Sequence, residues 1–263
     1  MTQSTSHISP QAQARVALVT GAARRLGRAI ALGLAGAGWD VAVHYRHSEG
    51  EALETVEAIR ALGRRAVALG CDLADEAAVR LLAGRAADAL GPVTCIVNNA
   101  SLFEYDSATD FSPALLAAHM SANLAAPLLL AQALHAATPE DGQAVVINLL
   151  DQKLYNLNPD FLSYTLSKAA LDAATTMLAQ ALAPRLRVVG VAPGITLVSG
   201  DQSEEGFGKA HQATPLGRSS TPQDIADAVV YAASARALTG TTLVVDGGQH
   251  LVPLARDVMF LTK

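Results

Sequence analysis

Short runs of β-branched and apolar residues alternate with longer segments of helical period along most of this chain. Strands that are apolar on both faces are typical of a parallel sheet covered on both sides, and the intervening helices supply right-handed crossovers. We therefore predict a single α/β domain built on a doubly wound, seven-stranded parallel sheet with helices on both faces. The runs that predict strands are residues 15–20, 41–45, 65–70, 94–99, 143–150, 187–193 and 241–245.

The predicted domain covers residues 15–250, and the segments around it differ in composition. Residues 1–14 are polar and lack the features of a signal peptide, so they predict a flexible tail. Residues 195–219 are rich in Gly, Ser and charge and predict a substrate-covering loop, with a plain surface excursion as the alternative. Residues 251–263 are apolar enough to predict a subunit interface, the alternative being a tail folded back on its own subunit.

The overall charge argues against a nucleic-acid partner. The chain has 19 basic and 24 acidic residues, a net charge of −5, so a broad basic surface is not expected and a small-molecule partner is favoured. Cys71 and Cys95 lack the spacing of a metal site, so we expect no metal and two free thiols in a reducing, cytoplasmic setting.

The most apolar stretch, residues 124–137, is too short and too interrupted to predict a membrane span. Pro127, Gln132 and His135 are expected to break it before it reaches the ~18 residues that a span requires. We therefore expect no membrane partner.

A glycine-containing turn follows the first predicted strand. Gly21 stands directly after that strand and Gly27 begins the next helix, where free N–H groups and the helix dipole can hold a pyrophosphate. The match to GxGxxG is weak, because Arg25 occupies a position that is often glycine. The position of the turn at the start of a βαβ unit nevertheless favours a Rossmann-type dinucleotide site.

The residues after the second predicted strand bear on the choice of dinucleotide. Asp40 has roughly the spacing of a ribose-binding carboxylate but lies at the end of this strand away from the ligand. The ligand end instead carries Tyr45, Arg46, His47 and Ser48. A guanidinium, an imidazole and a hydroxyl suit a 2′-phosphate, so we predict NADPH over NADH, with an ordinary polar loop as the alternative.

Tyr164 and Lys168 share one face of the helix that follows the fifth predicted strand. An ammonium beside a phenol stabilises the phenolate, and lowering the Tyr pKa by three units requires about 4 kcal/mol. The pair therefore predicts a Tyr that transfers a proton, the alternative being a Tyr packed at the helix surface beside a solvated Lys. Asp151, thirteen positions before Tyr164, is an unexpected neighbour for such an acid.

Five motifs together resemble the short-chain dehydrogenase/reductases over residues 15–250. They are TGAARRLG, NNAS at 98–101, Asn123 in a mid-chain helix, YTLSK, and VAPG after the sixth predicted strand. The resemblance implies NAD(P)H, Tyr164 as proton donor, Lys168 holding the nicotinamide ribose, Asn123 supporting a proton-relay water, and a homotetramer. The family's usual Ser before the Tyr is replaced here by Asp151.

Within that family the chain is most similar to the pteridine reductases, including dihydromonapterin reductases. That subgroup also carries Asp in the Ser slot, Arg-Leu-Gly in the phosphate turn, a His-Tyr pair followed by His, Arg and Ser, and NNAS followed by Phe. Here Arg46 and His47 stand in swapped order, so the 2′-phosphate contact is left open between them.

The resemblance implies two sets of binding residues. Phe103 would stack on the pterin, and Arg25 would reach both the pterin and the pyrophosphate. The implied cofactor-binding residues are Gly21, Arg25, Leu26, Gly27, Tyr45, Arg46, His47, Ser48, Asp72, Leu73, Asn99, Ala100, Tyr164, Lys168, Pro193, Gly194 and Thr196. The implied substrate-binding residues are Arg25, Ser101, Phe103, Asp151 and Tyr164, with Thr196 also lining the pocket.

Asp151 bears on which kind of double bond the protein is expected to reduce. Hydride transfer to a carbonyl builds negative charge on oxygen, which an ionised carboxylate opposes, whereas a reduced C=N bond leaves a nitrogen that needs a proton. The expected substrate is a dihydropterin, with dihydromonapterin, dihydrobiopterin and dihydrofolate left open. The alternatives are a carbonyl or 3-oxoacyl reductase and a dinucleotide-binding regulator without turnover.

Overall fold

The computed structural model describes residues 15–198, 204–212 and 214–261, and the predicted N-terminal tail lies outside these residues. Within these residues seven strands form one parallel sheet in the order β3-β2-β1-β4-β5-β6-β7. The order reverses between β1 and β4, which is the switch point where doubly wound sheets bind ligands. The predicted fold class is confirmed. The strands are β1 (Arg15–Val19), β2 (Trp39–Tyr45), β3 (Ala66–Gly70), β4 (Val93–Asn98), β5 (Ala144–Leu149), β6 (Leu186–Pro193) and β7 (Thr242–Val245).

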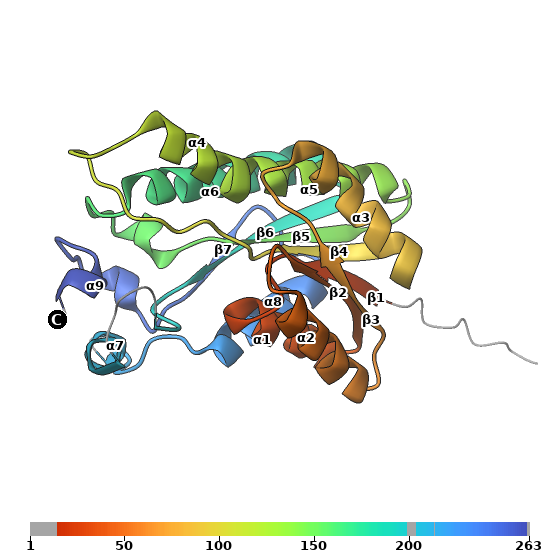
Figure 1. Ribbon diagram of the computed structural model, residues 1–263, viewed down its shortest axis with the longest axis horizontal. Helices are drawn as coiled ribbons and strands as arrows, with labels where there is room; N and C mark the ends of the chain where they lie inside the picture. The colour runs from red at the N-terminus through yellow and green to blue at the C-terminus, as the bar shows by residue number, and fades with distance from the viewer. Residues whose placement is uncertain (1–14, 199–203, 213, 262–263) are drawn as a thin grey trace, which may run out of the picture.

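Helices cover both faces of the sheet (Figure 1). One layer holds α1 (Arg25–Gly36), α2 (Glu49–Ala61) and α8 (Pro222–Ser234), and the other holds α3 (Glu76–Leu90), α4 (Pro113–Met120), α5 (Ala126–Ala137) and α6 (Leu162–Leu182). Each layer buries its own apolar cluster against the sheet. Ile30, Ile59 and Ile225 belong to the first cluster, and Leu82 and Leu130 to the second.

Capping residues explain where two of these helices begin. Asp75 accepts a hydrogen bond from the N–H of Ala78 at the start of α3. Thr221 and Asp224 form a reciprocal capping box at the start of α8, with Pro222 in its first turn. These side chains satisfy N–H groups that the helix itself leaves unpaired.

The apolar helical segment around Pro127 is longer than the sequence analysis expected. A π-helical turn, η1 (Ser121–Ala125), joins α4 to α5, so the helix runs through Pro113–Ala137 without a break. Pro127 lies directly after this π-helical turn, in the first turn of α5. Among the described helices this one is long and apolar enough to span a bilayer, but core helices of other proteins pass the same test. Here it packs against α3, α6 and the sheet.

The helix that carries Tyr164 begins at a strained residue. Phe161 precedes α6 in the left-handed region, with a φ of 56°. Asp106, from the segment after β4, accepts hydrogen bonds from the N–H of Ser163, at 2.9 Å, and from its hydroxyl. The Asp106 carboxylate therefore caps α6 and fixes the loop after β4 to the start of this helix.

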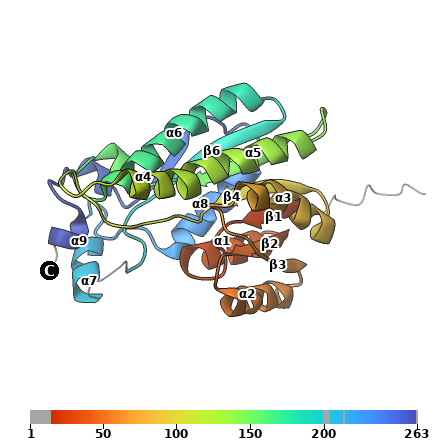
Figure 2. The ribbon, with the colours of Figure 1, turned by 45° about the horizontal axis from the view of Figure 1, so that its top comes forward.

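Four short elements lie beyond the strand ends. They are η2 (Gln152–Tyr155), α7 (Glu204–Gln212), η3 (Gln249–Leu251) and α9 (Val258–Leu261). The helix α7 forms within the predicted substrate loop, and α9 forms within the predicted C-terminal tail. These two helices contact one another at one end of the molecule (Figure 2).

Candidate active site

The turn between β1 and α1 has the shape expected of a phosphate site. Gly21 is in the left-handed region, with a φ of 62°. A Cβ on Gly27 would lie 2.1 Å from the carbonyl oxygen of Gly21, so only glycine allows the helix and the turn to approach this closely. The helix begins at Arg25, two residues earlier than predicted, and within the described chain no side chain caps its first turn. Its N–H groups therefore fit a pyrophosphate.

Arg25 explains why the match to the glycine motif is weak. Its φ is 52°, so this arginine adopts the backbone conformation that a glycine would adopt at low cost. Such strain costs about 1–3 kcal/mol and is found mainly at functional sites. The guanidinium donates a hydrogen bond to the carbonyl oxygen of Val198 at 2.7 Å. Arg25 thus joins the phosphate turn to the segment after β6.

Two residues that the sequence analysis did not assign hold this turn in place. The Thr20 hydroxyl accepts hydrogen bonds from the N–H groups of Asn99 and Ala100, both at 3.0 Å. His44, on β2, is 1% exposed; its Nδ1 accepts from the N–H of Gly21 and its Nε2 bonds to the carbonyl oxygen of Cys71, both at 3.0 Å. Burial lowers the pKa of His44, which favours the neutral ring that these contacts need.

The predicted 2′-phosphate residues gather at the carboxyl ends of β2 and β3. Arg46 Nε lies 3.2 Å from the carboxylate of Asp72, and both side chains are exposed. The Tyr45 ring packs against Gly70, where a Cβ would lie 3.1 Å from the phenol oxygen. Ser48 precedes α2 and does not cap it. His47 is exposed beside these residues, and Leu73 packs into the core between β3 and α3.

Asp151, Tyr164 and Lys168 meet at the carboxyl end of β5. The Tyr164 hydroxyl donates a hydrogen bond to Asp151 Oδ2 at 2.8 Å, and Asp151 Oδ1 accepts from the N–H of Lys153 at 2.8 Å. Lys168 Nζ donates to the carbonyl oxygen of Leu149 at 2.7 Å and lies 5.8 Å from the centroid of the Tyr164 ring. The expectation that Asp151 shares the site of Tyr164 is met by this contact.

The proton affinities differ from what the sequence predicted. Burial, followed by the charge and hydrogen bond of Asp151, raises the pKa of Tyr164 well above its usual value of 10.0. The expected lowering of this pKa was therefore wrong in direction, because burial comes first and Asp151, rather than Lys168, is hydrogen-bonded to the phenol. Burial also raises the pKa of Asp151 and lowers that of Lys168 to about 8. Asp151 and Tyr164 therefore both have pKa values above those of the isolated side chains.

Asn123 connects the loop after β4 to α6. Its Oδ1 accepts from the N–H of Leu102 at 2.8 Å and from the Ser101 hydroxyl at 3.2 Å. Its Nδ2 donates to the carbonyl oxygen of Leu102 and to the Ser167 hydroxyl, both at 3.0 Å. The side chain projects from the π-helical turn η1, a kind of distortion that is common at functional sites. Its amide therefore positions Ser101 and α6.

Phe103 presents an aromatic surface beside Tyr164. Its ring stacks on Phe161 with centroids 4.4 Å apart, and it meets the ring of Tyr164 edge-on at 4.7 Å. Phe103 is 41% exposed, so one face remains open for a flat ligand. Phe161, which the sequence analysis did not assign, supports it from behind.

The end of β6 closes the opposite side of the site. A Cβ on Gly194 would lie 2.6 Å from the Ser219 hydroxyl and 2.7 Å from Asp246 Cβ, so this position also requires glycine. The Thr196 hydroxyl donates to the carbonyl oxygen of Gly194 at 2.9 Å and contacts the Ser220 hydroxyl at 2.7 Å. These contacts fix the start of the predicted substrate loop.

A cavity of about 630 Å³ brings many of the predicted residues together. Its volume suits a small molecule beside the end of a cofactor. The predicted residues that line it are Arg25, Leu26, Asn99, Ser101, Phe103, Asp151, Tyr164, Lys168, Pro193, Gly194 and Thr196. Those outside its lining are Gly21, Gly27, Tyr45, Arg46, His47, Ser48, Asp72, Leu73, Ala100 and Asn123. Among the described residues, no group of three or more His, Cys, Asp or Glu forms a metal site.

The C-terminal tail contributes a wall that the sequence analysis did not predict. Leu254, Asp257, Val258 and Met259 line the cavity of their own subunit. The apolar residues that predicted a subunit interface are therefore partly covered within one chain, while Leu251 remains exposed. The interface itself stays a prediction.

The predicted substrate loop is described only in part, because residues 199–203 and 213 lie outside the described residues. Its described ends approach the site through Thr196 and through the contact of Val198 with Arg25. Its helix α7 contacts α9 of the tail. The function of this segment as a lid stays a prediction.

Comparison with known proteins identifies relatives of this chain over most of its length. A family model described as enoyl-(acyl carrier protein) reductase matches residues 21–250. An uncharacterised oxidoreductase of Mycobacterium tuberculosis is 39% identical, covering 89% of this chain and 91% of the relative. An L-rhamnose 1-dehydrogenase (NAD(P)(+)) of a Sphingomonas species is 31% identical over 249 residues, covering 91% of this chain and 97% of the relative.

A solved structure with a bound ligand is similar to this chain in sequence and in fold. The FolM alternative dihydrofolate reductase 1 of Brucella canis, complexed with NADP, is 42% identical to this chain. The two chains superpose with a TM-score of 0.88, covering 92% of this chain and 96% of the other. The sequence relatives and the structural relative thus agree on oxidoreductases but differ in their substrates.

Proposed function

The chain belongs to the short-chain dehydrogenase/reductase family, and we propose that it is an NADPH-dependent reductase of dihydropterins. The observation that carries the proposal is the hydrogen bond of 2.8 Å between the Tyr164 hydroxyl and the Asp151 carboxylate, inside the cavity. It places a carboxyl group where a developing oxyanion would be opposed and a nitrogen could be protonated.

The residues present fit NADPH. The close approach of Gly27 to Gly21 and the uncapped start of α1 suit a pyrophosphate. Arg46 and His47 would hold the 2′-phosphate, and Lys168 would hold the nicotinamide ribose. When bound, NADPH supplies the hydride. The NADP in the similar Brucella canis structure supports this choice.

The proposed reaction adds a hydride to the carbon and a proton to the nitrogen of a C=N bond. The raised pKa values of Asp151 and Tyr164 keep protons on this pair near neutral pH more readily than on isolated side chains. The Tyr164 hydroxyl faces the cavity and would donate the proton, directly or through Asp151. Phe103 would stack on the flat pterin ring.

A panel of substrates tests the proposal by the loss of NADPH absorbance. We expect oxidation of NADPH with 7,8-dihydropterins and far slower oxidation with ketones. Preferential turnover of ketones or 3-oxoacyl thioesters would favour a carbonyl reductase, a function closer to that named for the Sphingomonas relative. Tight NADPH binding without turnover of either class would favour a dinucleotide-binding regulator.

We also propose a homotetramer in the cytoplasm. Exposed apolar side chains such as Leu251 and Val252 support an interface at the C-terminal end, and the buried free thiols of Cys71 and Cys95 suit a reducing compartment. Light scattering at micromolar concentration tests the assembly, and a monomer would contradict it.

A further inference from the structure

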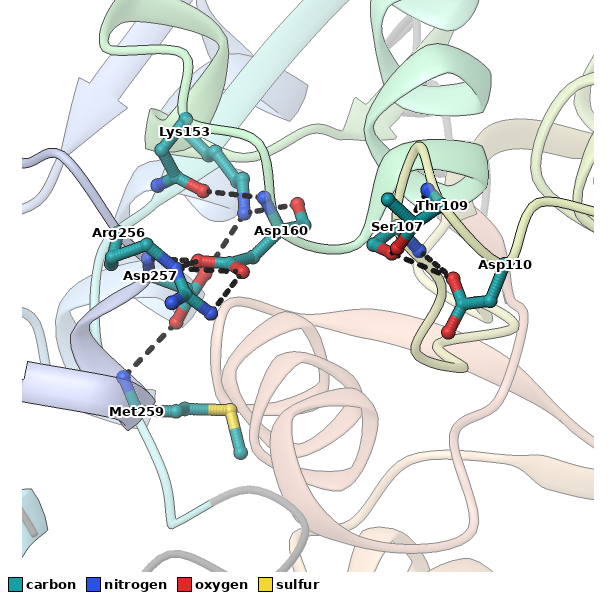
Figure 3. Close-up of polar contacts among 9 residues, drawn as sticks. Ser107, Thr109, Asp110, Lys153, Asp160, Arg256, Asp257 and Met259 are labelled. Carbon is teal, nitrogen blue, oxygen red and sulfur yellow. Dashed lines mark hydrogen bonds and ion pairs between the residues drawn. The ribbon is translucent and has the colours of Figure 1, made fainter.

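Lys153 is a buried cation beside the catalytic pair, and the proposed reaction does not use its charge. Its side chain is 4% exposed. Its Nζ donates to the Asp257 carboxylate at 3.0 Å and to the carbonyl oxygen of Asp160 at 2.7 Å (Figure 3). The same Nζ lies 5.3 Å from the centroid of the Phe161 ring. A buried ammonium is costly unless its charge is paired, so Asp257 stabilises the ionised form of Lys153.

Asp257 belongs to a segment that we call the C-terminal strap, residues 254–260. A second ion pair fixes the same segment: Arg256 donates to both carboxylate oxygens of Asp160, at 2.7 and 2.8 Å. The N–H of Asp257 also donates to Asp160 at 2.7 Å, and the N–H of Met259 donates to Asp257 at 3.1 Å. Figure 3 shows these residues converging from the strap and from the segment after β5.

The strap gives the cavity an apolar wall. Leu254, Val258 and Met259 line the cavity together with Asp257, whose carboxylate is directed to Lys153. Apolar side chains of this kind favour a flat heteroaromatic ligand over water. These side chains line the cavity only while the strap is docked. The ion pair that holds the strap should therefore affect the affinity for the ligand.

Two routes connect the strap to the groups that act on substrate. The N–H of Lys153 donates to Asp151 Oδ1 at 2.8 Å, so the residue that holds the strap also orients the catalytic carboxylate. Phe260 lies 6.3 Å from Phe161 between ring centroids, and Phe161 stacks on Phe103. Displacement of the strap would therefore remove support from both Asp151 and Phe103.

We propose that Lys153 and Asp257 are a positioning pair that docks the C-terminal strap over the cavity and holds Asp151 and Phe103 in place for the substrate. The proposal rests on the proposed function for its kinetic consequences. The docking itself is a property of the chain that can be measured without turnover.

Three full-length variants and one control test the pair. Lys153→Met and Asp257→Leu each leave one charge without its partner. The double variant Lys153→Met with Asp257→Leu replaces the pair by apolar side chains, a change that proteins often tolerate without loss of stability. Arg80→Met is the control, since it breaks an exposed ion pair with Glu76 on α3, far from the site in the sequence and outside the cavity lining.

Amide hydrogen exchange of residues 254–260 measures docking directly. Each single variant should exchange these amides at least about a hundredfold faster than wild type, because removing one partner of a buried pair is strongly destabilising. The control should exchange at the wild-type rate. Unchanged exchange in both single variants would overturn the proposal, whether or not dihydropterins prove to be substrates.

Kinetics then separate positioning from a merely structural role. Each single variant should raise KM for a dihydropterin by about tenfold, a loss of roughly 1.4 kcal/mol, with a smaller change in kcat. The double variant should be no worse than either single variant, because the two residues act as a unit. The positioning role would be contradicted if the increases in KM of the two single variants multiplied in the double variant. It would also be contradicted if the amides of residues 254–260 exchanged faster while KM stayed unchanged. No turnover by the wild-type enzyme would contradict the proposed function alone.

Discussion

Replacing Asp151 by Asn tests the feature on which the proposed reaction depends. The carboxylate accepts hydrogen bonds from the Tyr164 hydroxyl and from the N–H of Lys153, both at 2.8 Å. An Asn carbonyl can keep one of these bonds, but its NH2 group then faces the other donor. A hydrogen bond to a charged group contributes about 1.5–3 kcal/mol, and acid-base assistance contributes about 10²–10⁴-fold in rate.

We therefore expect Asp151→Asn to reduce turnover of a dihydropterin by about 10²-fold or more. The pKa of Tyr164 should fall, because the charge of Asp151 helps to raise it. Stopped-flow measurement of NADPH oxidation gives the rate, and the ultraviolet absorbance of tyrosinate during a pH titration gives the direction of the pKa change. Binding of NADPH, measured by its fluorescence, serves as the control for folding.

Asp151→Ser separates the two reaction classes, because it restores the hydroxyl that the family usually carries. It should lower dihydropterin turnover by a similar factor while removing the charge that opposes an oxyanion. Near-wild-type turnover of dihydropterins by both variants would refute the reasoning, since the carboxyl group would then have no part in the proton transfer.

Three further changes have expected outcomes. The rate of dihydropterin turnover should fall as the pH rises through about 8, where the ammonium of Lys168 loses its proton. In a pH-rate profile, the residual activity of Lys168→Met should lack this dependence. Arg46→Ala and His47→Ala should each lower kcat/KM for NADPH by about tenfold or more and leave NADH nearly unchanged, since charge-assisted bonds to phosphate are lost; equal losses with both cofactors would exclude a 2′-phosphate contact. Gly27→Ala should abolish tight NADPH binding and destabilise the protein by about 1–3 kcal/mol in denaturant unfolding, because its Cβ would lie 2.1 Å from Gly21.

The sequence predicted the sheet well because its signal is local. Each strand is a short apolar run between turn residues, and parallel pairing follows from the helices between them. The small elements α7 and α9 were not predicted, because each is short and contacts with other parts of the chain decide the conformation of such short segments.

The site was predicted where motif and strand end coincide. Asp151, Tyr164 and Phe103 meet in one cavity as expected from their places after β5 and β4. Asp106 and Asp257 were not predicted, because their partners lie 57 and 104 positions away in the sequence. The direction of the Tyr164 pKa could not be predicted either, because it depends on which charge contacts the phenol.

The hydrogen bond between His44 and Gly21 makes the turn between β1 and α1 sensitive to low pH. Nδ1 of the ring accepts from a backbone N–H, so a proton added there would place two donors face to face. Burial lowers the pKa of His44 from 6.5, and the unfolded chain therefore binds this proton first. The stability contributed by the neutral ring is present above pH 6.5 and is lost as the pH falls through the lowered pKa of the folded state. We therefore expect the affinity for the dinucleotide to fall on acidification, at a higher pH than the pH at which the sheet unfolds.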